Sequence, residues 1–210
     1  MNTNIDTATQ TSFDAVAQVW TEGRTTHSFV EREVSPELIE QVVDALRWGP
    51  TAMNAGPMRV IQLRSEESRA RLAPYMSTGN RRKTEIAPLT LLVAADNNFH
   101  QHFDVLAPHM PNAVETWENM EQVRVQMARD NAHLQAGYLI TALRAAGLSI
   151  GPMSGFDAAG IDKEFFSGTG LKTIMAINVG HGPQDIAELG HGAVHPRGAR
   201  LAVEQIVTTL

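Results

Sequence analysis

Five short segments hold the residues best suited to chemistry, and two of them suit a phosphate. The first combines a cation, two hydroxyls and an imidazole: Arg24, Thr25, Thr26 and His27. The second places Arg197 and Arg200 three residues apart near the C-terminus. A guanidinium binds phosphate oxygens through a planar fork, and nearby hydroxyls add further donors. Taken alone, the first segment is better explained as a polar loop between helices.

The other three segments suit a flat ring. Asn80 and Lys83 place an amide and an ammonium on one side of a helical turn, where they can serve a ring edge that gains negative charge. Two loops rich in glycine, proline and small residues allow backbone groups to approach a ring closely. The candidate residues of these loops are Pro50, Thr51 and Asn54, and then Pro152, Met153, Ser154 and Gly155. Each segment alone is better explained as a turn or a solvated charged face.

Several familiar signatures are absent from the sequence. It contains no G-x-x-x-x-G-K-[ST] phosphate loop, no G-x-S-x-G turn and no H-E-x-x-H pair. Its G-x-G fragments lack the third glycine of a dinucleotide-binding turn. His191 and His195 are four residues apart, but the neighbouring glycines and Pro196 disfavour a helix. We therefore interpret them as loop histidines and expect no metal site.

Hydrophobic periodicity and capping signals predict the elements that position these segments. Apolar runs predict strands over residues 60–63, 88–95 and 171–179, and the last two suit strands covered on both faces. Helices are expected over residues 13–20, from Ser35 to Gly49, from Ser65 to about Tyr75, over 131–146 and from Asp157 to Phe166. This alternation indicates the α+β class, with a central mixed sheet flanked by helices.

Composition narrows the classes of partner and compartment. The 210 residues carry a net charge of −6, which argues against nucleic acid or an anionic membrane as the main partner. The absence of cysteine excludes a disulfide framework and a cysteine nucleophile, and no window approaches the roughly 18 to 20 apolar residues of a membrane span. We expect a soluble, cytoplasmic protein with a single domain over residues 13–210, after a flexible tail over residues 1–12.

The order and spacing of the five segments resemble those of the FMN-dependent nitroreductase family, from Arg24 to the C-terminus. Members of that family carry an arginine- and serine-rich phosphate motif, a P-S-x-x-N-x-x-P loop, an N-x-x-K pair, a P-x-x-G-F loop and a late basic pair. Three departures occur here: a threonine replaces the second serine, the later cation falls at His27 or Ser28, and the loop glutamine is Gly56.

This resemblance implies a nitroreductase-like fold, an intertwined homodimer, and FMN held at the dimer interface by both chains. It implies that Asn80 contacts the pyrimidine edge and that Lys83 is the catalytic cation, which stabilises charge on reduced flavin. NADPH or NADH would give hydride to the flavin, and a small-molecule substrate would then take it in a ping-pong cycle. The phosphate contacts implied are Arg24, Thr25, Arg197 and Arg200.

Three stretches are further similar to the family members that reduce malonic semialdehyde in bacterial pyrimidine degradation: residues 48–51, 77–80 with Lys83, and 151–157. The product would be 3-hydroxypropanoate. A broad nitro or quinone reductase and a flavin-binding storage or sensor protein are the alternatives. An acidic substrate needs a cation, for which Arg81, Arg82 and Arg124 are candidates, each equally well explained as a solvated surface charge. Residues 99–129, with Phe103, His109 and Trp117, either line the substrate side or pack in the core.

Overall fold

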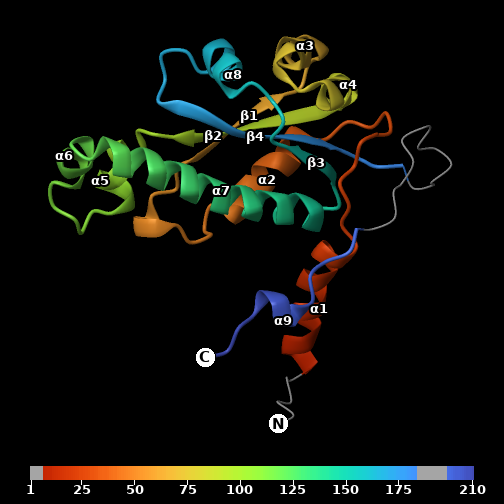
Figure 1. Ribbon diagram of the computed structural model, residues 1–210, viewed down its shortest axis with the longest axis horizontal. Helices are drawn as coiled ribbons and strands as arrows, with labels where there is room; N and C mark the ends of the chain where they lie inside the picture. The colour runs from red at the N-terminus through yellow and green to blue at the C-terminus, as the bar shows by residue number, and fades with distance from the viewer. Residues whose placement is uncertain (1–6, 184–197) are drawn as a thin grey trace.

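The computed structural model describes residues 7–183 and 198–210 and centres on a four-stranded sheet between two layers of helices (Figure 1). The strand order is β1-β2-β4-β3. The strands are β1 (Met58–Leu63), β2 (Leu89–Asp96), β3 (Ser149–Met153) and β4 (Leu171–Gly180). All three neighbouring pairs are antiparallel, which differs from the mixed sheet predicted. Helices and strands alternate along the sequence in both mixed and antiparallel sheets of this kind. Their order therefore did not determine the direction of the strands.

Two apolar layers enclose the sheet, which explains why all eight residues of β2 are buried, as predicted. One layer lies between the sheet, α2 (Pro36–Leu46) and α7 (Glu121–Ala145). The other lies beneath α3 (Glu66–Leu72) and α8 (Ala158–Phe165), on the face that also carries α4 (Thr78–Ile86). The short elements are η1 (Ala52–Asn54), η2 (Ala73–Tyr75), η3 (Phe99–His102), α5 (Phe103–Leu106), α6 (Ala113–Glu118) and α9 (Val203–Ile206).

Three helix starts predicted from capping residues are confirmed. The Ser35 hydroxyl accepts a hydrogen bond from the Leu38 amide at 3.1 Å, and Ser65 accepts from Ser68 at 3.1 Å. The Asp157 carboxylate accepts from the Gly160 amide at 3.1 Å. Each cap satisfies an amide that has no partner inside its helix, and a cap of this kind typically contributes about 1 kcal/mol.

The structure differs from the predicted elements mainly at β3 and in the lengths of two helices. Residues 149–153 form a strand where we expected a glycine-rich loop. Proline is tolerated there because β3 is an edge strand. Helix α7 begins at Glu121, ten residues earlier than predicted, because its first turns are largely exposed and lack a continuous apolar stripe. Helix α1 (Thr7–Thr21) likewise includes residues 7–12, which we had assigned to the tail.

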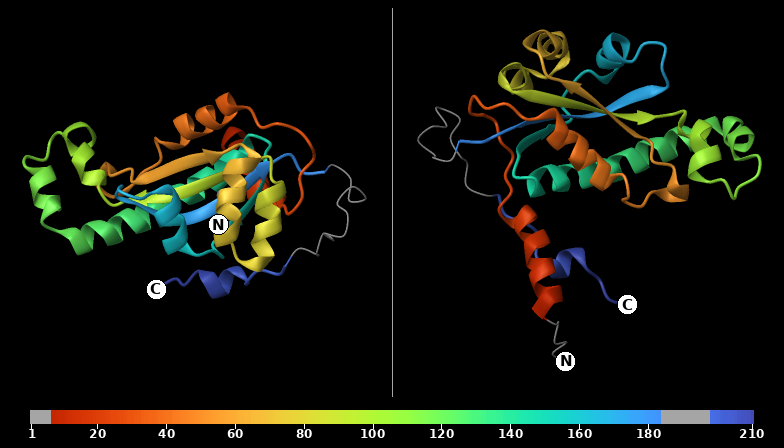
Figure 2. Two further views of the ribbon diagram at one scale, coloured as in Figure 1. Left: turned by 90° about the horizontal axis from the view of Figure 1, so that it is seen from above. Right: turned by 180° about the vertical axis from the view of Figure 1, so that it is seen from behind.

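Helix α1 and the C-terminal segment project from the main body (Figure 2). Phe13 and Trp20 on α1 are 60% and 53% exposed. Every residue from 198 to 210 is exposed, including five large apolar side chains: Leu201, Val203, Ile206, Val207 and Leu210. Among the described residues, no helix combines the length and apolar character that a membrane crossing requires.

Candidate functional site

The predicted phosphate segment, residues 24–27, runs along the outer edge of β3. Thr25 forms an isolated parallel bridge with Ile150, and the Thr26 amide donates to the Ile150 carbonyl at 2.8 Å. The Thr26 carbonyl oxygen would lie 2.6 Å from a Cβ atom added to Gly151, so a side chain at Gly151 would force the two backbones apart. The glycine of the predicted loop therefore permits the close approach of the phosphate segment to the sheet.

A second contact joins the predicted N-x-x-K segment to the residues just beyond β3. The Asn80 side-chain amide donates to the Gly155 carbonyl at 3.2 Å, and the Ser77 amide donates to the same oxygen at 3.0 Å. A Cβ atom on Gly155 would lie 2.9 Å from Ser77 Oγ and 3.0 Å from Asn80 Nδ2. Two segments that are 75 residues apart in the sequence thus meet.

Strand β3 and its extension connect these two ends. Five residue steps separate Ile150, which holds Thr25, from Gly155, which holds Asn80, and an extended chain of that length spans at most about 17 Å. Met153 lies between the two ends, and the buried Asn178 donates to its Sδ atom at 3.9 Å. We call residues 150–155 the β3 track. Its ends suit a ligand with a phosphate at one end and a ring at the other.

Lys83 lies on α4 one turn after Asn80 and is half-buried. Within residues 7–183 and 198–210, no carboxylate pairs with its ammonium. Its charge is therefore not neutralised by a described neighbour, and it can serve a ligand that carries or gains negative charge.

The fifth segment, Pro50 to Asn54, lies on the opposite, α2–α7 side of the sheet from α4 (Figure 1). The Tyr138 hydroxyl donates to the Pro50 carbonyl at 3.0 Å, and the Asn131 side chain accepts from the Ala52 amide at 2.8 Å. Asn54 donates to the Leu106 carbonyl at 2.9 Å and has a left-handed backbone, with φ of 55°. A single chain therefore does not bring this segment together with Asn80 and Gly155.

The two C-terminal arginines are not placed at the β3 track. Arg197 lies outside the described residues, as do His191 and His195. Arg200 is exposed, and its guanidinium donates to the carbonyls of Gly198 and Ala199 at 2.9 and 3.0 Å. Their contact with a phosphate stays a prediction.

Sequence reasoning missed a pocket of about 550 Å³ beside Thr51 and Asn54. The pocket is lined by the end of α2, by η1 and by the first part of the segment between β2 and α7. The lining residues include Leu46, Trp48, His102, Val105 and Leu106. Trp48 is 79% exposed and Val105 75% exposed. The available signal was an aromatic residue directly before the Gly49-Pro50 turn, because large exposed aromatics often mark contact sites.

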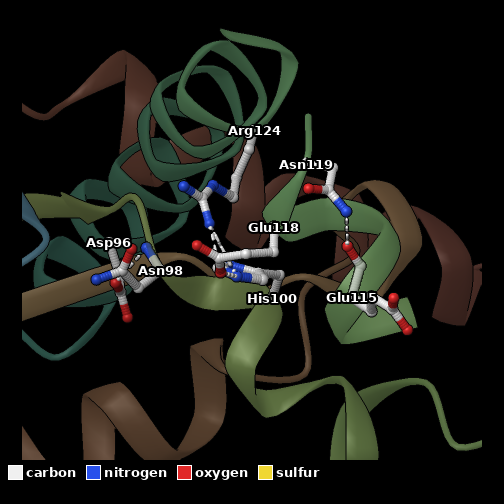
Figure 3. A network of polar contacts seen from close by, with 7 residues as sticks. All are labelled: Asp96, Asn98, His100, Glu115, Glu118, Asn119 and Arg124. Atoms are coloured by element: carbon white, nitrogen blue, oxygen red, sulfur yellow. Dashed lines mark hydrogen bonds and ion pairs between the residues drawn. The ribbon is translucent and has the colours of Figure 1, made fainter. Parts of the chain in front are cut away.

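A partly buried polar network joins the segment between β2 and α7, residues 97–120, to α7 (Figure 3). His100 Nε2 lies 2.6 Å from Glu118 Oε2, and Arg124 Nη1 donates to the same carboxylate oxygen at 3.2 Å. The hydrogen bond from His100, with the nearby charge of Arg124, lowers the pKa of Glu118. Arg124 is 7% exposed, so it is not a solvated surface charge, and its guanidinium contacts Glu118 and His100. Its role as a substrate cation stays a prediction.

The remaining candidates on the substrate side divide between core and surface. Phe103 and Trp117 pack together in the core, with ring centroids 6.1 Å apart, whereas His109 is exposed. The Arg81 guanidinium donates to the Ala73 carbonyl at 3.2 Å, and Arg82 pairs with Glu85 on the surface.

Fold and site together define an α+β protein with a nucleotide-length track along one edge of its sheet. The chain belongs to the Nitroreductase family, whose family model matches residues 22–181. It is 44% identical over 187 residues to a "Putative NADH dehydrogenase/NAD(P)H nitroreductase" of Leptothrix cholodnii, covering 89% of this chain and 91% of the relative. A relative of the same description from Streptomyces griseus is 41% identical over 199 residues, covering 94% and 97%.

Solved structures show the same fold at lower sequence identity. The "putative nitroreductase ydfN" of Bacillus subtilis superposes with a TM-score of 0.80 at 21% identity, covering 94% of this chain and all of that one. A "putative nitroreductase in complex with FMN" from Exiguobacterium sibiricum has a TM-score of 0.75 at 19% identity, covering 93% and 97%. The predicted nitroreductase-like fold is confirmed.

Proposed function

We propose that the protein is an FMN-dependent oxidoreductase that uses NADPH or NADH to reduce a small molecule. The observation that carries this proposal is the β3 track, which joins residues 24–27 at one end to Asn80 and Gly155 at the other. The residues present fit FMN, because the cation and hydroxyls lie at one end and the amide at the other. Glycines at 151 and 155 let Thr26 and Asn80 approach the two ends of the track, because a Cβ atom at either position would collide with them.

Each part of the track has a distinct task in this proposal. Arg24, Thr25 and Thr26 hold the phosphate, and Asn80 fixes the edge of the ring. Lys83 places its ammonium where negative charge accumulates on reduction. The backbone of residues 152–155 bounds the reacting face. FMN, when bound, supplies the acceptor and donor of hydride.

We infer a homodimer in which each site uses two chains. Pro50, Thr51 and Asn54 lie on the far side of the sheet from Asn80, so a site that uses all of these residues needs a second copy. The exposed apolar side chains of α1 and of residues 201–207 are the kind of surface that an obligate interface covers.

We propose malonic semialdehyde as the substrate, which rests on the similarity of residues 48–51, 77–80 and 151–157. A broad nitro or quinone reductase is the second candidate, and the names of the relatives at 44% and 41% identity favour it.

One experiment separates these possibilities. The purified protein is tested for FMN released by heat, and NADPH and NADH oxidation is followed with malonic semialdehyde, a non-acidic aldehyde of equal length, a nitroaromatic and a quinone. We expect a yellow protein that prefers the acidic aldehyde. Equal rates with both aldehydes and faster nitroaromatic reduction favour the broad reductase. Bound FMN that NAD(P)H does not bleach indicates storage or sensing, and failure to bind added FMN overturns the flavoenzyme proposal.

A further inference from the structure

A pocket of about 640 Å³ lies where the end of α1 meets the end of α7, next to the start of the β3 track. Its lining includes two arginines far apart in the sequence, Arg24 and Arg144. Sequence reasoning assigned Arg24 to a phosphate and gave Arg144 no role. The pocket is thus an extension of the phosphate end of the proposed cofactor site.

Arg144 reaches this pocket from the last turn of α7. Its guanidinium packs against Gly23, since a Cβ atom added there would lie 2.8 Å from both Arg144 Cζ and Nη1. The guanidinium therefore lies beside the residue that directly precedes Arg24. The buried Nε atom of Arg144 shows that the base of the guanidinium is enclosed by the protein.

The pocket combines positive charge with hydroxyl groups. Among the described residues that line the pocket, two are arginines and one is a glutamate, Glu22, whose carboxylate already accepts a hydrogen bond from Gln18 at 2.8 Å. Thr26 and Ser149 contribute hydroxyls, and Ser149 Oγ accepts from the Gly182 amide at 3.0 Å. A pocket lined by two planar guanidiniums and by hydroxyl groups is suited to a phosphate dianion.

We propose that Arg144 binds the phosphate of FMN together with Arg24. This inference rests on the proposed function, because FMN supplies the phosphate. The alternative role is structural: a cation in the last turn stabilises the negative end of the α7 dipole without touching a ligand.

The test compares FMN with riboflavin, which has the same ring and no phosphate. Dissociation constants of both are measured by quenching of flavin fluorescence, with flavin-free full-length protein and its Arg144→Gln variant. Loss of one charged hydrogen bond weakens binding roughly tenfold to a hundredfold. We expect a loss of that size for FMN and an unchanged constant for riboflavin. Lys163→Gln, an exposed lysine on α8, is the charge-matched control and should change neither constant.

The binding constants distinguish failure of the Arg144 assignment from failure of the proposed function. An unchanged ratio of FMN to riboflavin affinity in Arg144→Gln overturns the assignment of Arg144 and leaves the flavoenzyme proposal intact. Wild-type protein that binds neither flavin overturns the proposed function, and the assignment of Arg144 with it. If Arg144→Gln does not fold, Arg144→Lys decides: it retains the charge but not the planar fork, so we expect a smaller loss that is still confined to FMN.

Discussion

Gly155 shows how one missing side chain shapes the candidate site at the scale of a residue. Its carbonyl holds Ser77 and Asn80, and a methyl group in place of its hydrogen would reach both side chains. Gly79 lies in the adjacent α4 helix, and no neighbouring atom lies within 4 Å of a Cβ atom placed there. The two glycines form a matched pair, one confined and one open.

We expect Gly155→Ala to weaken FMN binding by about tenfold, because the Asn80 amide must move away from the carbonyl that orients it. Gly79→Ala should leave the dissociation constant of FMN unchanged and raise the free energy of unfolding by up to about 1 kcal/mol. Fluorescence titration and urea unfolding measure the two quantities. Equal FMN affinities of the two variants would contradict the assigned role of Gly155.

At the scale of an element, the His100–Glu118–Arg124 network ties η3 and α6 to α7. The pKa of Glu118 is lowered in the folded protein from its ordinary value of 4.5. A carboxylate with a depressed pKa stabilises the fold above its ordinary pKa, and this stabilisation is lost as the pH falls through the folded-state value.

Glu118→Gln should therefore lower the urea midpoint of unfolding at pH 7, and its difference from wild type should shrink as the pH falls below 4.5. Glu115→Gln is the control on the same helix, since only the backbone carbonyl of Glu115 is engaged by Asn119. A Glu118→Gln deficit that stays constant from pH 7 to pH 3 would contradict an electrostatic role for this carboxylate.

Some helices and strands could be predicted from neighbouring residues in the sequence, and others could not. The caps Ser35, Ser65 and Asp157 act within three residues of themselves, so their helices were predictable. Strand β3 was not, because Gly151 and Pro152 resemble a turn until Thr26 and β4 are known to flank them. The first turns of α7 lack an apolar stripe because solvent surrounds most of them.

The sequence predicted which segments are candidates for the site, but it did not predict how these segments are arranged in space. Asn80 and Gly155 meet, whereas Asn54 lies on the other side of the sheet. Arg144 was missed because its partner surface, Gly23, is more than a hundred residues away and carries no side chain to signal the contact. Relations of this kind depend on tertiary packing, which periodicity does not encode.

At the scale of the whole molecule, the separation of Lys83 from Asn54 gives a test of the two-chain site. Lys83→Gln and Asn54→Ala chains are each expected to lose most activity as homodimers. If each site is shared as proposed, a mixed dimer holds one intact site, composed of Lys83 from one chain and Asn54 from its partner. Random pairing makes about half of the dimers mixed, so co-expression should restore about a quarter of wild-type NAD(P)H oxidation.

Activity is measured on co-expressed chains, with each variant purified alone as the reference. Activity no higher than the mean of the two single variants would show that Lys83 and Asn54 do not serve one shared site. Sedimentation at the protein concentration of the assay provides the control. Mixed dimers can restore activity only if the dimer does not dissociate at that concentration.

The two edges of the sheet differ in whether they can accept a strand from another molecule. Thr25 and Thr26 already occupy part of the β3 edge, and Pro152 has no amide hydrogen to offer a further strand. In the described part of the chain, β1 pairs only with β2, which leaves its other side open. Continuous polymerisation through strand addition needs two receptive edges on every molecule. With one edge already blocked, any such pairing between copies ends at two molecules, and the sheet cannot propagate into a fibre.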